Sequence, residues 1–352
     1  MRLERRRELS RAWWLAAPFV AVGGTLAVGS ILVAWAGAPV GQAYWLLVDG
    51  AFGSRFALSE TLTRATPLIL TGLAVAVAFR ARLYNIGAEG QLYAGALAAV
   101  AVGTIGGGAS IVPDPVLFVA MLAAAMVAGA LLLLGPALLK VRFGVDEVVT
   151  TLLLNFIALL FVSLLLDGPM KDPTAMGWPQ SVALPPALEL TRLLDRSRVH
   201  SGLPLALALA VGLWAANRFT VIGFEMRAVG ANARAAAFAG MSVAKVIAKT
   251  AVLSGALAGL AGAVEVAGRA GYVTLDMSPG YGYSGIVIAM LAQLNPLGVV
   301  AAGVFVAAVL VGADSMSRAI AVPTYLADVL VAVALVFMLV ATMFARFRLR
   351  WR

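Results

Sequence analysis

The sequence predicts an all-α polytopic membrane protein with about ten transmembrane helices. Hydrophobic residues make up 62% of the 352-residue chain and charged residues only 12%. Four stretches are almost free of charge over about 20 positions, the length at which a helix rising about 1.5 Å per residue spans a ~30 Å hydrocarbon core. These stretches are 13–36, 115–139, 148–166 and 324–345. We therefore expect residues 1–352 to form a single transmembrane domain.

Further spans follow from the apolar runs between charged segments. In chain order we place the spans at 13–36, 58–79, 84–105, 115–139, 147–166, 203–217, 246–267, 282–294, 297–313 and 324–345. The first span follows several arginines, as in a signal peptide, but its apolar run of about 24 residues exceeds the 7–15 of a signal peptide. We expect it to be retained.

The charged residues between spans predict the orientation. With the N-terminus in the cytoplasm, basic residues fall in the inner loops and the C-terminal tail, as the positive-inside rule requires. They are Arg80, Arg82, Lys140, Arg142, Arg218, Arg227, Arg234, Lys245, Arg346, Arg348, Arg350 and Arg352. The short outer loops are mixed or acidic, and the long outer loop 167–202 is more balanced. Both termini are therefore expected to be cytoplasmic.

Two predicted spans are irregular. The third begins Leu83-Tyr84-Asn85-Ile86-Gly87-Ala88-Glu89-Gly90-Gln91, and the eighth begins Gly280-Tyr281-Gly282-Tyr283-Ser284-Gly285 before a short apolar run. If the chain consists of two inverted five-helix halves, these spans correspond, and interrupted helices at matching places indicate a substrate pathway. Alternatively, the glycines serve close helix packing.

Two polar side chains lie inside predicted spans. Asn155 follows Asp146 by nine residues, which is about 13 Å along a helix. Its amide needs a partner, either on another helix, the simpler explanation, or on a solute. Glu89 is a costly charge within a span, where a carboxylate normally faces a cavity or the bundle interior. Alternatively, Glu89 pairs with Arg80 or Arg82 at the cytoplasmic rim.

Three acid–base pairs with helical i,i+4 spacing lie at the outer ends of predicted spans. They are Glu60 with Arg64, Glu265 with Arg269, and Asp314 with Arg318. The simplest explanation is interfacial snorkelling with local pairing worth a few tenths of a kcal/mol. The alternative is a charged docking rim for an external protein.

The predicted inner segment 223–242 contains a short alanine-rich helix. Asn232 can cap its start, Gly240 can end it, and the net charge of the segment is positive. Such a helix would present Phe238 and Met241 either to the membrane surface or to a groove on a soluble partner.

Several classes of function lack their sequence signatures. The chain has no cysteine, which removes thiol catalysis and thiolate metal sites. Its single histidine, His200, is expected to be a solvated loop residue. No Walker motif, His-Glu-x-x-His or Gly-x-Ser-x-Gly occurs. The net charge of +9 is explained by the basic inner loops rather than by nucleic-acid binding. We expect no catalytic residue, metal or cofactor in this chain.

Five stretches resemble the permease subunits of bacterial ABC importers. The resemblance is to the branch near the simple-sugar and branched-chain amino acid permeases that serves nucleosides through basic-membrane-lipoprotein-type receptors. The stretches are Tyr84-Asn85-Ile86-Gly87-Ala88-Glu89-Gly90-Gln91-Leu92, 146–158, Asp167-Gly168-Pro169-Met170-Lys171-Asp172-Pro173, Arg227-Ala228-Val229-Gly230-Ala231-Asn232, and 280–298. They cover most of the chain in the same order.

The resemblance implies a fold similar to the vitamin B12-type (type II) importers, placed in the bacterial inner membrane. It also implies a second permease subunit, often a related chain, ATPase subunits that use ATP and Mg²⁺, and a substrate-binding lipoprotein. The coupling helix that engages the ATPase would include Arg227, Asn232, Arg234, Phe238 and Met241. Relatives commonly have proline where this chain has Ala233.

The resemblance further implies that ATP closes the ATPase domains and that the coupling helix passes this movement to a central pathway. Aromatic side chains are expected to stack on a nucleoside base, and amides to bind its ribose or base edge. The expected pathway residues are Asn85, Glu89, Gln91, Asn155, Phe156, Tyr281, Tyr283, Gln293 and Asn295. The six members of the outer acid–base pairs would dock the receptor.

Three alternatives remain open from the sequence. The same fold could import a monosaccharide, riboflavin or another small solute. An ion-coupled secondary transporter would favour paired acids near the membrane midplane, whereas most acids here lie near span ends. A membrane enzyme is the third alternative, but no catalytic constellation is visible.

Overall fold

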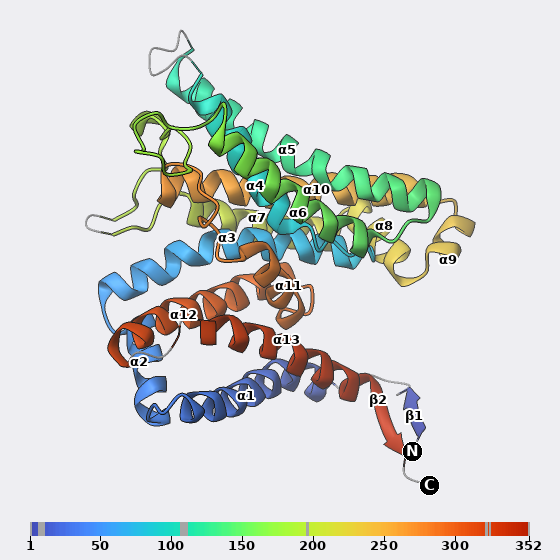
Figure 1. Cartoon of the computed structure of the whole chain (residues 1–352). Helices are drawn as coiled ribbons and strands as arrows, with labels where there is room; N and C mark the ends of the chain where they lie inside the picture. Colours follow the sequence, from blue (N-terminus) through green and yellow to red (C-terminus); the bar gives the residue numbers. More distant parts are fainter. Residues whose placement is uncertain are drawn as a thin grey trace.

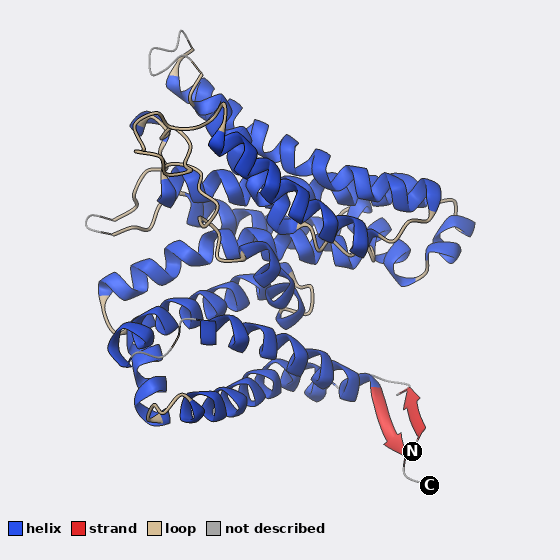
Figure 2. Ribbon diagram, in the orientation of Figure 1, coloured by secondary structure: helices blue, strands red, loops and turns tan. Residues whose placement is uncertain are grey.

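The computed structural model describes residues 2–5, 11–105, 112–194, 197–320, 323 and 325–350. This part of the chain is almost entirely helical, and the long helices run side by side (Figures 1 and 2). The helices are α1 (Arg11–Trp35), α2 (Val40–Phe52), α3 (Arg55–Arg80), α4 (Ala88–Gly103), α5 (Asp114–Phe143), α6 (Glu147–Asp167), α7 (Gly202–Phe219), α8 (Val221–Ala231), α9 (Ala233–Phe238), α10 (Val243–Glu265), α11 (Tyr281–Leu291), α12 (Pro296–Ile320) and α13 (Tyr325–Arg346). Two short turns are η1 (Pro186–Leu188) and the π-helical η2 (Val266–Ala270).

Each of the ten predicted ranges overlaps a helix. Within the described residues, six helices are long and apolar enough to cross a membrane: α3, α5, α6, α7, α10 with η2, and α12. The bent pair α1 and α2 would make a seventh. Helix α11 is apolar but short, at about 16 Å, and does not by itself span a ~30 Å core. The architecture is that of a multi-pass membrane protein.

Helix α2 was not predicted, since the sequence analysis treated residues 37–57 as a connection. It bends 117° away from α1 after Gly37, whose φ of 76° suits glycine. Gly50 on α2 lies against Ser315 and Gly312 of α12, and Ala43 and Ala51 are buried. The helix is therefore stabilised by α12 rather than by its own length.

Small residues let the central helices approach closely. Helix α10 packs on α4 and α5, and its Gly255, Gly259 and Gly262 face backbone atoms of those helices. A Cβ at Gly259 would overlap the carbonyl of Ala125, and one at Gly262 would overlap the carbonyl of Leu92. Inside a bilayer the hydrophobic effect does not drive helices together, and close packing through small residues takes its place.

The two ends of the bundle differ. Helices α3, α5 and α7 finish at one end with Arg80, Arg142 and Arg218, and we call this the basic end. Helix α9 and both chain ends lie toward the basic end, where strand β1 (Arg2–Arg5) pairs antiparallel with β2 (Phe347–Arg350) (Figure 1). We call the opposite end, where the connection between α6 and α7 lies, the loop end.

The connection between α6 and α7 is folded onto the loop end. Backbone N–H groups of Ser181, Leu184 and Leu190 donate to the carbonyls of Val273, Gly271 and Ala267. Leu184 and Leu188 are buried. The long loop thus supplies partners for backbone groups that the end of η2 leaves without helical bonds.

Candidate translocation and coupling sites

The two irregular segments meet at the centre of the bundle. Residues 81–87 lead from the basic end to the start of α4, and residues 271–280 lead from the loop end to the start of α11. The backbone N–H of Gly282 donates to the Glu89 carboxylate over 2.6 Å. A Cβ at Gly282 would overlap the backbone of Ala88 and Glu89. We call this contact between the N-termini of α4 and α11 the central crossing.

Glu89 is buried in the central crossing and forms no ion pair with Arg80 or Arg82 in the described part of the chain. The alternative in which Glu89 pairs with one of these arginines at the rim is therefore wrong, and the carboxyl group faces the interior of the bundle. Its carboxyl group lies instead in the first turn of α4 and beside the first N–H groups of α11, where a helix dipole stabilises negative charge.

The side-chain amides of Asn85 and Gln91 form hydrogen bonds with each other at the N-terminal end of α4. The Asn85 amide donates to Gln91 Oε1 (2.9 Å) and to Ser254 Oγ (3.1 Å), and the Gln91 amide donates back to Asn85 Oδ1 (2.8 Å). Ser254 donates in turn to the carbonyl of Ala74 over 2.7 Å. All are buried. In this conformation the two amides join α3, α4 and α10.

Asn155 joins α6 to the central crossing. Its Oδ1 accepts from the N–H of Gly90 (2.8 Å), and its Nδ2 donates to the carbonyl of Ile86 (2.8 Å) and to Tyr283 Oη (3.2 Å). This geometry matches the helix-adhesion explanation of the sequence analysis. Tyr283 is 38% exposed, so aromatic surface remains accessible next to the crossing, whereas Phe156, 56% exposed, belongs to the exposed side of α6.

Tyr281 is fully buried, and its contacts hold the start of α11 against α3. Its carbonyl accepts from Thr71 Oγ1 (2.9 Å), and its N–H donates to Ser278 Oγ (3.0 Å). Tyr93, which the sequence analysis missed, donates to the carbonyl of Leu275 over 2.6 Å and so holds segment 271–280 in place. Tyr93 lies one helical turn after Glu89, a spacing that is visible in the sequence.

The predicted acid–base pairs converge at the loop end. Arg64 pairs with Glu60 (3.3 Å) and with Asp314 (2.7 Å), and Arg198 of the long loop reaches Glu60 (3.4 Å). These side chains and Arg318 line a cavity of about 580 Å³. The expected pair of Asp314 with Arg318 is wrong, because Arg64 of α3 takes Asp314. Arg198 was not singled out from the sequence.

The pair Glu265–Arg269 forms as expected, at 2.5 Å. Glu265 is only 1% exposed, and Arg269 Nη1 also lies 3.5 Å from Tyr281 Oη. The pair therefore links η2 to the start of α11 from inside the protein. Neither Glu265 nor Glu60, which is also buried, presents its carboxylate on an outer surface.

His200 is buried at the loop end, with 2% exposure, and its Nδ1 accepts from the N–H of Gly202 over 3.2 Å. Its ring fills the space above Gly268. Burial lowers the pKa of His200 to about 4. The expectation of a solvated histidine is wrong, because the long loop folds back instead of extending into water.

The segment 223–242 contains α8 and α9. Asn232 caps α9 by accepting from the N–H groups of Arg234 (3.0 Å) and Ala235 (3.1 Å), and Gly240 follows with a φ of 85°. Both features were predicted. Phe238 is 95% exposed, whereas Met241 is half-buried and packs on the core, so only the phenylalanine is presented.

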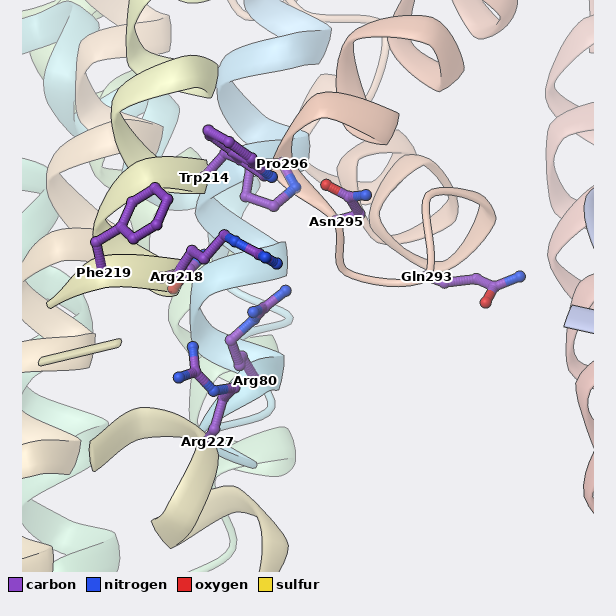
Figure 3. Close-up of a pocket in the computed structure, with 9 residues that line it drawn as sticks. Arg80, Trp214, Arg218, Phe219, Arg227, Gln293, Asn295 and Pro296 are labelled. Carbon is purple, nitrogen blue, oxygen red and sulfur yellow. The ribbon is translucent and has the colours of Figure 1, made fainter. Parts of the chain in front are cut away.

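A second cavity, of about 700 Å³, opens at the basic end. Gln293 and Asn295 line it from the turn between α11 and α12, and Arg80, Arg218 and Arg227 line it from α3, α7 and α8 (Figure 3). Gln293 and Leu294 adopt φ values of 51° and 60°, which are uncommon without glycine. Arg227 thus faces this cavity rather than the exposed side of α9.

Comparison with known proteins places the chain in a family. Residues 57–339 match the family described as "Branched-chain amino acid transport system / permease component". The chain is 37% identical over 327 residues to the guanosine ABC transporter permease protein NupP of Bacillus subtilis, with 92% of each chain covered. The chain belongs to this family of ABC transporter permeases.

Two further relatives bear on the permease. It is 39% identical over 363 residues to the glucose ABC transporter permease protein TsgB13 of Haloferax volcanii, covering 99% of the permease and 93% of the relative. It is 29% identical over 309 residues to the nucleoside ABC transporter permease protein NupB of Lactococcus lactis, with coverages of 86% and 84%. No solved structure matches it.

The matched range contains the central crossing, the cavity at the basic end and the segment 223–242. Membership of an ABC permease family implies that the permease works with an ATPase and a substrate-binding protein. The family resemblance inferred from the five sequence stretches is thereby confirmed.

Proposed function

We propose that the permease forms the membrane pathway of an ATP-driven importer for nucleosides. The similarity to NupP and NupB, whose names specify guanosine and nucleosides, carries this proposal. The part-exposed ring of Tyr283, bonded to the Asn155 amide, supports it, because an aromatic face suits a base and an amide suits its polar edge. A sugar offers no flat aromatic face. A monosaccharide is nevertheless the second candidate, because the name of the relative TsgB13 specifies glucose.

The proposed architecture is a ten-span, type II permease made of two inverted halves, in the bacterial inner membrane with both termini cytoplasmic. The presence of both termini, α9 and the arginine-rich helix ends at one end of the bundle supports this orientation. The meeting of the third and eighth predicted spans at the central crossing supports the inverted halves.

Each proposed partner has a surface on the permease. The ATPase, which would bind ATP and Mg²⁺, receives the exposed Phe238 on α9. A second permease subunit covers the apolar outer face of α6, where Leu153, Phe156 and Leu160 are exposed. The receptor lipoprotein docks at the loop end through Arg198 and Arg318, while the buried Glu60 and Glu265 hold Arg64 and Arg269 in position.

Movement of the ATPase would reach the central crossing through α8. Gly230 of α8 lies directly against the carbonyl of Arg80, where α3 ends and the chain turns toward α4. A displacement of α9 and α8 therefore shifts segment 81–87. This segment leads directly into α4, whose Glu89 contacts Gly282 at the central crossing. In this proposal the two half-helices part and rejoin as the pathway alternates.

The test is reconstitution of the permease with its ATPase and receptor in liposomes. Receptor-stimulated ATP hydrolysis and uptake are measured with guanosine, adenosine, uridine, glucose and riboflavin. Stimulation by nucleosides alone supports the proposal. Stimulation by glucose alone would favour the second candidate, a monosaccharide importer. Uptake driven by an ion gradient without ATP would indicate a secondary transporter.

A further inference from the structure

The cavity at the basic end gathers three arginines from three different helices. Arg80 ends α3, Arg218 lies in the last turn of α7, and Arg227 lies on α8. All three line the cavity, and the guanidinium groups of Arg80 and Arg218 extend to the same side of it (Figure 3). The remaining walls come from Trp214, Asn217, Phe219, Gln293, Asn295 and Pro296. None of the described residues that line the cavity is acidic.

Within the described residues, these three arginines lack the ion pairs that several other cations of the bundle form. Arg64, Lys140, Arg198 and Arg269 each form an ion pair with a carboxylate, whereas within the described residues Arg80, Arg218 and Arg227 form none. Arg80 and Arg227 repel each other electrostatically. Three like charges held together without a counter-charge raise the free energy of the empty site, and an anion would lower it.

The positive-inside rule accounts for arginines at this end, but not for their convergence. Arg80 is half-buried and is held by a hydrogen bond from its guanidinium to the carbonyl of Leu294. Arg218 lies over the ring of Phe219, 5.8 Å from its centroid. Each of these contacts restrains a guanidinium group at the cavity wall, and a preformed fork of N–H donors is what recognises phosphate oxygens.

We propose that this cavity is a binding site for the phosphate group of a phosphate ester. Arg80, Arg218 and Arg227 hold the phosphate, and Trp214 and Phe219 flank the organic part of the ligand. The volume of about 700 Å³ lies within the range of small-molecule sites. Two sources share this chemistry: the head group of an anionic phospholipid and a soluble nucleotide. That the site faces the cytoplasm rests on the proposed orientation, but binding itself does not.

Occupancy has a consequence for coupling. Arg80 and Arg227 belong to α3 and α8, whose contact at Gly230 is the proposed route of movement. A phosphate bridging both guanidinium groups therefore ties α8 to the end of α3. If the ligand is a nucleotide made from imported nucleoside, accumulated product would restrain further import.

The test measures binding to the purified full-length permease in nanodiscs of zwitterionic phosphatidylcholine. Guanosine 5′-monophosphate is titrated against the wild type, Arg218→Gln and Arg227→Gln, with guanosine as the phosphate-free control ligand. Arg142→Gln is the matched control variant, because Arg142 also ends a helix beside a phenylalanine, at 6.0 Å from the Phe143 ring centroid, but lies outside the cavity. Thermal unfolding checks that each variant is folded.

A soluble ligand predicts that guanosine 5′-monophosphate binds, that guanosine does not, and that Arg218→Gln and Arg227→Gln each weaken binding by about tenfold or more. A lipid ligand predicts instead that, in discs containing phosphatidylglycerol, native mass spectrometry detects retained phosphatidylglycerol on the wild type and less on these two variants. Either result supports the site. If neither ligand distinguishes these variants from Arg142→Gln, the proposal is wrong. Loss of nucleoside transport alone would leave it standing.

Discussion

At the scale of single residues, several buried polar side chains in this permease are satisfied by backbone atoms of other segments. Asn155 bonds to Gly90 and Ile86, and Glu89 accepts from Gly282. An unsatisfied polar group costs more in a bilayer than at a wet surface, so each such contact specifies the position of two segments. Glycine permits the closest of these approaches.

Gly282→Ala is expected to destabilise the permease. The added Cβ would overlap the backbone of Glu89, which cannot move without opening the central crossing, and overpacking of this kind costs about 1–3 kcal/mol. Gly212→Ala is the control, because nothing lies within 4 Å of its Cβ and alanine there favours the helix by roughly 1 kcal/mol. Thermal unfolding in detergent should show a lower Tm only for Gly282→Ala; equal Tm values would contradict the close contact.

Because His200 is buried, the free energy of unfolding is expected to fall in acid. Its pKa is about 4 in the folded protein and about 6.5 when unfolded, so the unfolded state binds the proton more strongly. The stability contributed by neutral His200 is complete above about pH 6.5 and is lost as the pH falls toward 4, by up to roughly 3 kcal/mol.

The measurement is the Tm of the wild type and of His200→Gln at pH 7.5 and pH 5. The wild type should lose more Tm on acidification than the variant, which carries no titratable group at this position. A parallel decline in both proteins would show that other groups dominate in this pH range.

At the scale of elements, short helices carry the contacts that the long spans cannot make. Helix α9 is only six residues long, capped by Asn232, and holds Phe238 outside the bundle. Helix α11 places its N-terminus at the central crossing instead of at the membrane surface. Each gains its stability from a cap or a neighbour, since isolated helices of this length are marginal.

Phe238→Ala is expected to weaken assembly with the ATPase. A fully exposed ring inserted into a partner's groove typically contributes about 2 kcal/mol or more, which is roughly a 30-fold change in affinity. Phe143→Ala is the control, because Phe143 is also exposed at the basic end but lies on α5. Co-purification and receptor-stimulated ATP hydrolysis should fall only for Phe238→Ala. If both variants retain coupling, α9 does not engage the ATPase through this ring.

At the scale of the whole molecule, the distribution of charge and the position of the short elements distinguish the two ends of the bundle. The helix ends rich in arginine, α9 and both termini share one end, while the folded long loop and its ion-pair cluster occupy the other. The proposed import mechanism needs this polarity, because the receptor and the ATPase must act from opposite sides of the membrane.

The orientation can be measured with single cysteines, because the native chain contains none. Met176→Cys lies in the long loop and Ala235→Cys on α9, and both native side chains are exposed. A membrane-impermeant thiol reagent added to intact cells should label Met176→Cys, and should label Ala235→Cys only after permeabilisation. The reverse pattern would invert the proposed orientation, and labelling of both from outside would contradict a sealed bundle.

The sequence by itself determined the features that depend on local spacing. Apolar runs located a helix in every predicted span, and Asn232 and Gly240 defined α9, because caps and periodicity are properties of neighbouring residues. The five family stretches identified the permease family for the same reason, since each is a continuous run.

Only the tertiary structure decided which distant groups meet. It showed that Asp314 pairs with Arg64 rather than Arg318, that Gly282 contacts Glu89, that His200 is buried, and that α2 packs on α12. It also brought Arg80, Arg218 and Arg227 to one cavity. These contacts join segments far apart in the chain, and their energies depend on how whole helices pack, which no local pattern of residues encodes.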